Sequence, residues 1–242
     1  MVKKIFKWIG KIAIIFFIFS ILQVVIFRFV PVYYTPLMVW NNTVQLFTKG
    51  KVVCEHTWIP IEDISPNLPL AVVASEDNLY LDHSGFDFKQ IEVAMKEAEK
   101  GKRKRGASTI SQQTAKNAFL WQGKSWVRKG LEVYYTLLIE TIWGKERIME
   151  VYLNSIEMGE NIYGAEAVAR QHFNRSAKKL TAAQCALIAA SLPNPIRFNS
   201  GKPSGYMLKR QAKILDLMRK GKPVDFDDDS EKSTSKKGSK KR

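Results

Sequence analysis

The sequence is poor in the residues that form metal sites and disulfide frameworks. Its 242 residues include only two cysteines and three histidines. Cys54 and Cys185 lie far apart, and Cys185 stands in an apolar run of helical character, so we expect buried thiols rather than a disulfide. His56, His83 and His172 do not have metal-ligand spacing, which gives no basis for a zinc site. Cysteine usage leaves the redox compartment open.

The main part of the chain also lacks the patterns of β structure and of repeats. Residues 68–220 show no strand-like alternation and no repeat at a fixed period, and their periodicity is helical nearly throughout. We expect Ser125 to cap the N-terminus of one helix and Gly144 to cap its C-terminus. Thr181 and Gln184 have the spacing of a capping box at the start of another helix. These patterns predict an all-α domain.

Acidic residues are in the minority. The chain has 38 Lys and Arg against 23 Asp and Glu, a formal net charge of +15. This excess predicts an anionic partner, and charge alone does not choose among nucleic acid, acidic lipid and a phosphorylated substrate. Residues 221–242 combine an acidic run with a basic end and have little to bury, so we predict a disordered charged tail.

A charge-free apolar run near the N-terminus predicts a transmembrane helix. Residues 12–27 carry no charge, and with their neighbours they reach the roughly 20 residues that a bilayer requires, which places the span at residues 11–30. A cleaved signal peptide is the alternative. The apolar run is longer than the roughly 7 to 15 residues of a signal core, and Phe29-Val30-Pro31 is a poor cleavage site.

The charges that flank this span predict its orientation. Four lysines precede the charge-free run, and a single arginine, Arg28, follows it. The positive-inside rule therefore places residues 1–10 in the cytoplasm and the rest of the chain outside. Residues 31–67, with several prolines and aromatic residues, read as a membrane-proximal connector to a domain at 68–220.

Residues 105–120 predict a helix with a polar face that solvation alone does not explain. Thr109 and Gln112 have capping-box spacing at its start. Gln112, Gln113, Lys116 and Asn117 recur on one face, and most of them are hydrogen-bonding groups rather than ions. A helix N-terminus preceded by the basic run at 102–105 favours an anion, so we expect phosphate and sugar hydroxyls as ligands.

Two glutamates are candidates for acid–base or electrostatic roles. Glu76 directly follows an apolar stretch, where desolvation raises a carboxyl pKa and suits it to proton transfer. Its alternative is a charge on a helix surface. Arg128 and Lys129 precede Glu132 by four and three residues, so both cations should hold that carboxylate ionised. The alternative for Glu132 is an ordinary intrahelical salt bridge.

These motifs, in this order, resemble those of the family-51 peptidoglycan glycosyltransferases over about residues 65–215. The first motif runs from Glu76-Asp77 through Tyr80 to His83 and Gly85, the second from Gly106 to Asn117, the third is Arg128-Lys129 with Glu132, the fourth runs from Lys145 to Phe173, and the fifth is Ala186–Pro195. Tyr80 stands where the family usually has Phe, and Ala107 where a second Gly is common.

The resemblance implies a fold and a reaction. It implies a lysozyme-like helical domain with a flexible, membrane-facing segment at about residues 86–106. The reaction that it implies is polymerisation of lipid II, in which the growing chain on undecaprenyl pyrophosphate would be the donor and the 4-hydroxyl of an incoming lipid II the acceptor. By resemblance Glu76 is the base and Glu132 the second essential carboxylate. Because Glu132 lies between cations, we expect it to position charge against pyrophosphate rather than to donate a proton.

The resemblance also implies substrate-binding residues and partners. The expected substrate-binding residues are Ser108, Gln112, Gln113, Lys116, Asn117, Arg128 and Lys129. No cofactor is expected to be required, and the sequence leaves a Mg²⁺ or Mn²⁺ ion open. The expected partners are lipid II, the lipid-linked glycan, the membrane and other cell-wall synthesis proteins, and not nucleic acid. The expected location is the bacterial cytoplasmic membrane, with the catalytic domain in the periplasm.

No penicillin-binding domain follows the last motif, so we expect a monofunctional glycosyltransferase. Two other functions stay open on the sequence alone. A glycan-cleaving muramidase or lytic transglycosylase could use a similar helical scaffold, although such an enzyme needs no clamp for pyrophosphate. A non-catalytic membrane adaptor for wall synthesis would have no need for both Glu76 and Glu132.

Overall fold

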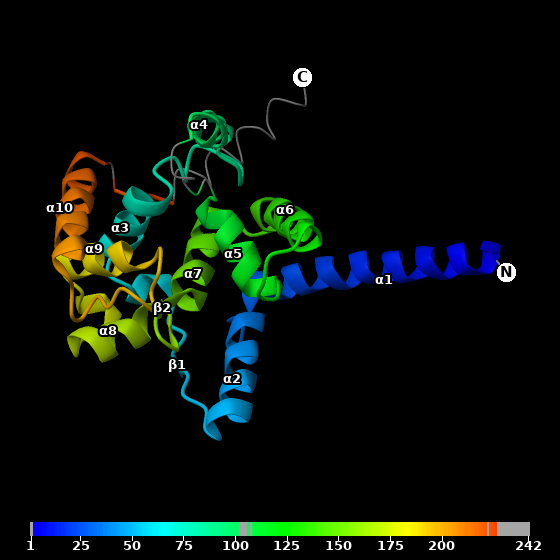
Figure 1. Ribbon diagram of the computed structural model, residues 1–242, viewed down its shortest axis with the longest axis horizontal. Coiled ribbons are helices and arrows are strands. Elements are labelled where there is room, and N and C mark those ends of the chain that lie inside the picture. Colours follow the sequence, from blue (N-terminus) through cyan, green and yellow to red (C-terminus); the bar gives the residue numbers. More distant parts are fainter. Residues whose placement is uncertain (1, 102–105, 107, 222, 227–242) are drawn as a thin grey trace.

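The computed structural model describes residues 2–101, 106, 108–221 and 223–226. Helices make up most of these residues, which confirms the predicted all-α class (Figure 1). The helices are α1 (Val2–Phe29), α2 (Pro36–Lys49), α3 (Asn67–Glu76), α4 (Phe88–Glu99), α5 (Ile110–Phe119), α6 (Trp126–Ile142), α7 (Lys145–Ser155), α8 (Ala165–Phe173), α9 (Ala182–Ser191) and α10 (Gly205–Lys220). Two short 3-10 helices, η1 (Ile61–Asp63) and η2 (Ala177–Lys179), complete the helical elements of the described ranges.

Helix α1 extends away from the other helices as a long rod (Figure 1). Its apolar side chains are largely exposed, among them Phe6 at 69% and Phe19 at 63%. In the part of the chain that the structure describes, it is the one helix long and apolar enough to cross a membrane. The last part of α1 differs, because Ser20 and Val24 are fully buried against the domain.

The prediction that the domain has no strands was wrong in one place. Strands β1 (Glu55–His56), β2 (Glu157–Gly159) and β3 (Ile162–Tyr163) form a small sheet in the order β1-β3-β2. β3 pairs parallel to β1 and antiparallel to β2. Strands of two or three residues are too short to show alternation, and so they carry no period-2 signal in the sequence.

Helix α5 lies at the centre of the domain and packs on α6 and α7 (Figure 1). A second group is formed by α9, which packs on α3 and α10. Fully buried side chains from both groups, including Ile110, Ile139, Tyr152 and Ile188, join one hydrophobic core. The core holds α3 and α5 in place, and these helices carry Glu76 and most of the predicted polar face.

Three of the four predicted helix caps are present. Both capping boxes are present, with Thr109 and Gln112 at α5 and with Thr181 and Gln184 at α9. Ser125 caps α6 as predicted, since its hydroxyl accepts from the Arg128 amide. The C-cap prediction was wrong: α6 ends at Ile142, and Gly144 with a φ of 80° is the N-cap of α7. A glycine between two helices can be the C-cap of the first helix or the N-cap of the second, and the sequence does not decide between these positions.

The segments on either side of the first motif contain more helix than the sequence indicated. The expected connector at 31–67 includes α2, which packs on α5. The expected flexible segment at about 86–106 includes α4, with Asp87 as its N-cap. The basic run at 102–105, Ala107 and residues 227–242 of the predicted tail lie outside the described residues. Both cysteines are free, and Cys185 is buried as expected.

Candidate active site

Glu76 is the last residue of α3, and its carboxylate is held by groups from three helices. Oε2 accepts a hydrogen bond from Gln113 Nε2 at 3.3 Å, and Oε1 accepts one from Ser75 Oγ at 3.3 Å. The guanidinium of Arg210 on α10 lies 3.7 Å from Oε1. Burial raises the pKa of Glu76, and these three contacts partly oppose the rise. With its side chain only 15% exposed, Glu76 is not an ordinary surface charge.

The face of α5 next to Glu76 is its partly exposed side. Gln113 and Lys116 are half-buried, whereas most other residues of α5 are buried. Tyr152 Oη donates to Gln113 Oε1 at 3.3 Å, so both ends of the Gln113 amide have partners. Tyr152 is fully buried, and burial raises its pKa well above the usual range, which keeps it a neutral donor. The Gln113 amide is thereby fixed against Glu76.

Glu132 lies at a second, cationic position. It is 4% exposed on α6, and both of its oxygens are ion-paired. Arg128 Nη1 lies 3.2 Å from Oε2, and Lys129 Nζ contacts Oε1. Burial lowers the pKa of Lys116, while Glu132 opposes the change and Arg128 and Lys129 reinforce it. Three cations therefore surround one carboxylate, which leaves a local excess of positive charge.

The two carboxylates flank one face of α5. Gln113 contacts Glu76, and Lys116, three residues later on the same face, lies within electrostatic range of Glu132. An anion bound at Lys116 would have the desolvated carboxyl group of Glu76 on one side and the cations Arg128 and Lys129 on the other.

The structure divides the other predicted substrate-binding residues into two groups. Ser108 is exposed at the entrance to α5. Gln112 and Asn117 are each only 5% exposed, and the Gln112 amide oxygen accepts from the Thr109 backbone in the capping box. Helical spacing predicted Gln112 and Asn117 on one polar face together with Gln113 and Lys116, but only Gln113 and Lys116 remain partly exposed. The packing of α6 and α7 on α5 explains why the open face is narrower than predicted.

A pocket of about 720 Å3 opens beside Glu76. Its lining includes Ser108 and three further acidic residues, Asp77, Asp82 and Asp87. Lys116 and Glu132 are not among the lining residues of this pocket. The acidic side suits neutral sugar hydroxyls better than phosphate, and the cationic side at Glu132 suits phosphate.

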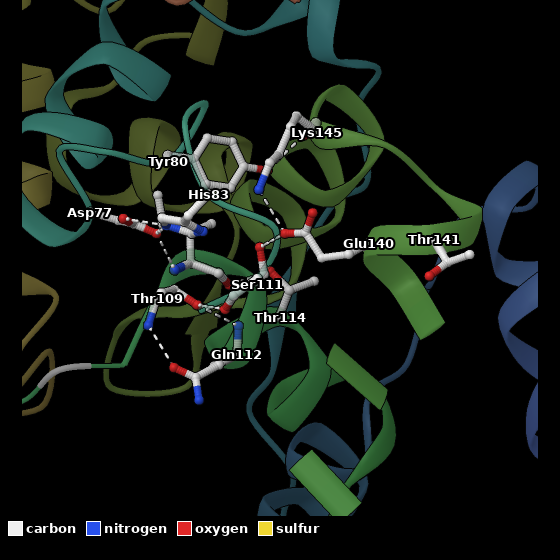
Figure 2. A network of polar contacts seen from close by, with 12 residues as sticks. Asp77, Tyr80, His83, Thr109, Ser111, Gln112, Thr114, Glu140, Thr141 and Lys145 are labelled. Carbon is white, nitrogen blue, oxygen red and sulfur yellow. Dashed lines mark hydrogen bonds and ion pairs between the residues drawn. The ribbon is translucent and has the colours of Figure 1, made fainter. Parts of the chain in front are cut away.

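Asp77 joins the first motif to the start of α5. Its carboxylate contacts His83 Nε2 at 2.9 and 3.1 Å and accepts a hydrogen bond from the Ile110 amide at 3.0 Å (Figure 2). Thr109 Oγ1 donates to the Gly85 carbonyl oxygen at 2.7 Å. A carboxylate at a helix N-terminus satisfies amides that have no partner within the helix. These contacts fix α5 relative to Glu76.

A buried ion pair between Lys145 and Glu140 stabilises the first turn of α5. Lys145 Nζ lies 2.7 Å from Glu140 Oε1, which also accepts a hydrogen bond from Ser111 (Figure 2). The ammonium lies 4.7 Å from the centre of the Tyr80 ring, and Tyr80 Oη donates to the Lys145 carbonyl oxygen at 2.7 Å. The hydroxyl that distinguishes Tyr80 from the family's usual Phe therefore has its own partner. Glu140 belongs to this structural network rather than to the open face.

Comparisons with known proteins identify the family of this chain. Residues 43–219 match the family described as Transglycosylase. The chain belongs to the transglycosylase family. Among its relatives, a protein of Bacteroides thetaiotaomicron named biosynthetic peptidoglycan transglycosylase is 60% identical over 239 residues, covering 98% of this chain and 96% of the relative. Proteins of the same name are 52% identical in Bdellovibrio bacteriovorus, covering 86% and 84% of the two chains, and 47% identical in Shewanella oneidensis, covering 90% and 93%.

One residue of this transglycosylase site was missed in the sequence. Arg210 contacts Glu76 and also donates to Ser75 Oγ at 3.1 Å, and its Nε is buried with no hydrogen-bond partner in the described structure. The sequence contains a signal for it. Met207 and Ile214 are buried on the same face of α10, so Arg210 is a charge on an otherwise apolar stripe. A charge in that setting indicates a specific partner.

No group of three His, Cys, Asp or Glu side chains suited to a metal occurs within the described ranges. Both oxygens of Glu132 are already paired with Arg128 and Lys129.

Proposed function

We propose that this transglycosylase polymerises peptidoglycan glycan strands from lipid II. The observation that carries the proposal is that a desolvated carboxyl group and a cluster of three cations flank one face of α5. Polymerisation needs both features, because a hydroxyl must lose a proton where a lipid-linked diphosphate departs. The names of the similar proteins, and the share of each chain that the similarity covers, support the same activity.

In the proposed reaction Glu76 acts as the general base. Its carboxylate takes the proton of the acceptor 4-hydroxyl while that oxygen attacks C1 of the donor sugar. The C1–oxygen bond to the diphosphate breaks, and undecaprenyl diphosphate leaves with the bonding electrons. Attack on the face opposite the leaving group inverts the configuration and gives a β-1,4 linkage. The raised pKa of Glu76 increases its basicity, and general-base catalysis of this type contributes about 10² to 10⁴ in rate.

The cationic side stabilises the charge that develops on the diphosphate. Lys116, Arg128 and Lys129 would bind the phosphate oxygens, with Arg128 suited to a bidentate contact. Arg128 Nε is buried without a hydrogen-bond partner in the described structure, so one N–H donor of this guanidinium is unused. We assign Glu132 to positioning, since its two oxygens hold Arg128 and Lys129 in place. Diphosphate is a good leaving group and scarcely needs a proton.

We place the enzyme in the bacterial cytoplasmic membrane as a single-pass protein. The apolar helix α1 supports membrane anchoring. The lysines before the span support a cytoplasmic N-terminus and a periplasmic domain. Other wall-synthesis proteins are proposed as partners because glycan strands must be cross-linked after they form, and nucleic acid is not proposed.

Incubation of the detergent-solubilised protein with labelled lipid II tests the proposed function. We expect a muramidase-sensitive polymer from the wild-type protein and none from Glu76→Gln, which should still bind a substrate-like inhibitor. Release of fragments from preformed peptidoglycan, without consumption of lipid II, would instead identify the glycan-cleaving alternative. Binding of wall-synthesis proteins with no reaction on either substrate would identify a non-catalytic adaptor.

A further inference from the structure

The chain continues beyond α10 as a short segment that passes α3. Gly221, the C-cap of α10, donates its amide hydrogen to the Leu217 carbonyl oxygen at 2.8 Å. A Cβ atom at Gly221 would lie 3.8 Å from Leu70 Cδ1 of α3, so the chain leaves α10 close to α3. Residues 223–226 continue on this side of the domain (Figure 1). They lie beyond residues 43–219, the part of the chain that matches the transglycosylase family.

Alternate side chains of this segment face the domain. Val224 and Phe226 are half-buried, whereas Pro223 and Asp225 are exposed. Such alternation is typical of an extended chain, in which successive side chains point to opposite sides. Phe226 packs against the hydrophobic core of the domain. Phe226 therefore anchors the segment, and Val224 is held two residues before this anchor.

The segment forms part of the pocket of about 720 Å3 that opens beside Glu76. Both Pro223 and Val224 line this pocket. Three apolar side chains of neighbouring helices line it with them, and these are Leu70, Val73 and Leu217. The end of α10, the adjoining part of α3 and the segment after α10 thus give the pocket an apolar surface.

The polar groups of this pocket are neutral or acidic. Three exposed polar residues line it, and these are Asn78, Asp82 and Ser108. The carboxylate of Asp77 already binds His83 and a backbone amide, and that of Asp87 caps α4. Lys220 also lines the pocket, but its ammonium lies 2.6 Å from Asp216 Oδ2. With Glu76 and Asp82 beside it, an anionic ligand is disfavoured in this pocket.

A sugar that carries an N-acetyl group has the surface that such a pocket complements. Its hydroxyl groups and its amide can form hydrogen bonds with Asn78, Asp82 and Ser108. Its acetyl methyl group can pack on the apolar side chains, which removes apolar surface from water. Pockets of about 300 to 1,000 Å3 with apolar walls and a few polar groups are typical of sites for small ligands. A diphosphate has no apolar group for this wall.

We propose that Leu217, Pro223 and Val224 form an apolar wall that binds the N-acetyl group of the acceptor sugar. The acceptor is the occupant because Glu76 lines the same pocket, and on the proposed function, on which this inference rests, Glu76 takes the proton of the acceptor hydroxyl. The wall makes the site selective, since a sugar with a hydroxyl in place of the acetamido group loses the apolar contact. Phe226 is a positioning residue, because it acts through Val224.

Methyl NMR of the full chain in detergent tests this proposal without a reaction. The probe is di-N-acetylchitobiose, and the matched control sugar is cellobiose, which has hydroxyls in place of the two acetamido groups. We expect chitobiose to shift the methyl signals of Leu217 and Val224, and cellobiose at the same concentration to shift them several-fold less. Leu208 is the internal control, since it is 47% exposed on α10, against 48% for Leu217, and lies outside the pocket lining. Equal shifts with the two sugars, or no shift at Leu217 and Val224, would overturn the proposal.

Variants of the wall give a second test in the polymerisation reaction. Leu217→Ala and Val224→Ala should raise KM for lipid II several-fold with little change in kcat, because the contact is the same in the bound state and in the transition state. Leu208→Ala should change neither constant. Phe226→Ala should raise KM as Val224→Ala does, and Phe226→Leu, which keeps an apolar anchor, should restore most of the wild-type KM. An unchanged KM in both Leu217→Ala and Val224→Ala would overturn the proposal.

The two tests separate this proposal from the proposed function. Chitobiose-specific shifts at Leu217 and Val224 in a protein that makes no polymer from lipid II would keep the sugar-binding wall and refute the polymerase. Polymer formation by a protein without these shifts would keep the polymerase and refute the wall.

Discussion

Replacement of Arg210 by alanine should move the acid limb of the pH–rate profile to higher pH. At 3.7 Å, two unit charges attract by about 1.1 kcal/mol in water and by about 4.5 kcal/mol at an effective dielectric constant of 20. The Arg210 side chain is 29% exposed, so we expect an effect near the lower end, about 1 to 2 kcal/mol. That energy corresponds to a proton affinity of Glu76 about five- to thirtyfold higher in the variant.

The sign of this effect follows from the charge that is removed. Without the guanidinium the carboxylate form of Glu76 is less stable, so its pKa rises further above the usual range and the base is protonated over a wider pH range. The assay is kcat/KM for polymerisation of labelled lipid II as a function of pH. Arg210→Lys should restore most of the wild-type profile, and Lys209→Ala removes an equal charge from an exposed position as a control. An acid limb that does not move in Arg210→Ala would refute the assignment of Glu76 as the titrating base.

Three further predictions concern the diphosphate side, stability and the buried network. Lys116→Ala should remove a charge-assisted contact with the diphosphate worth about 1.5 to 3 kcal/mol, which raises KM by roughly 10- to 150-fold. Lys124→Ala, on an exposed loop, should have little effect on KM. Equal KM values in the two variants would count against binding of the diphosphate by Lys116. Burial raises the pKa of Glu76, so its contribution to stability is present below the ordinary carboxyl pKa and is lost as pH rises through the folded pKa. Glu76→Gln should therefore raise Tm more at pH 8 than at pH 4, and an equal change at both would contradict the raised pKa. Lys145→Ala should lower the free energy of unfolding by about 3 to 5 kcal/mol, because it leaves Glu140 buried without its cation. A loss of less than about 1 kcal/mol, measured by urea unfolding, would contradict this prediction.

Local sequence rules predicted the parts of the fold that depend on a few neighbouring residues. The capping boxes at Thr109 and Thr181 were confirmed because each needs only a side chain and an amide three residues apart. The contacts of Glu132 with Arg128 and Lys129 were also confirmed, since they lie within one turn of one helix. The small sheet was missed because its strands are two or three residues long and because β1, near residue 55, pairs with β3, near residue 160.

The site depended more on packing than on spacing. Helical periodicity assigned Gln112 and Asn117 to the open face, but neighbouring helices bury them and leave Gln113 and Lys116 accessible. Arg210 was missed because it reaches Glu76 from a helix more than 130 residues away in sequence. Neither result follows from a local pattern, because both depend on how α5 and α10 pack in three dimensions.

A structure of the protein with a lipid II analogue that keeps its sugar and diphosphate would show directly which side of the site binds the diphosphate. We expect diphosphate oxygens within ion-pair distance of Lys116 and Arg128, with a sugar hydroxyl of a second molecule directed at Glu76. Diphosphate bound instead in the acid-lined pocket beside Asp82, with Lys116 and Arg128 making no contact to it, would refute the division of the site into a base side and a diphosphate side.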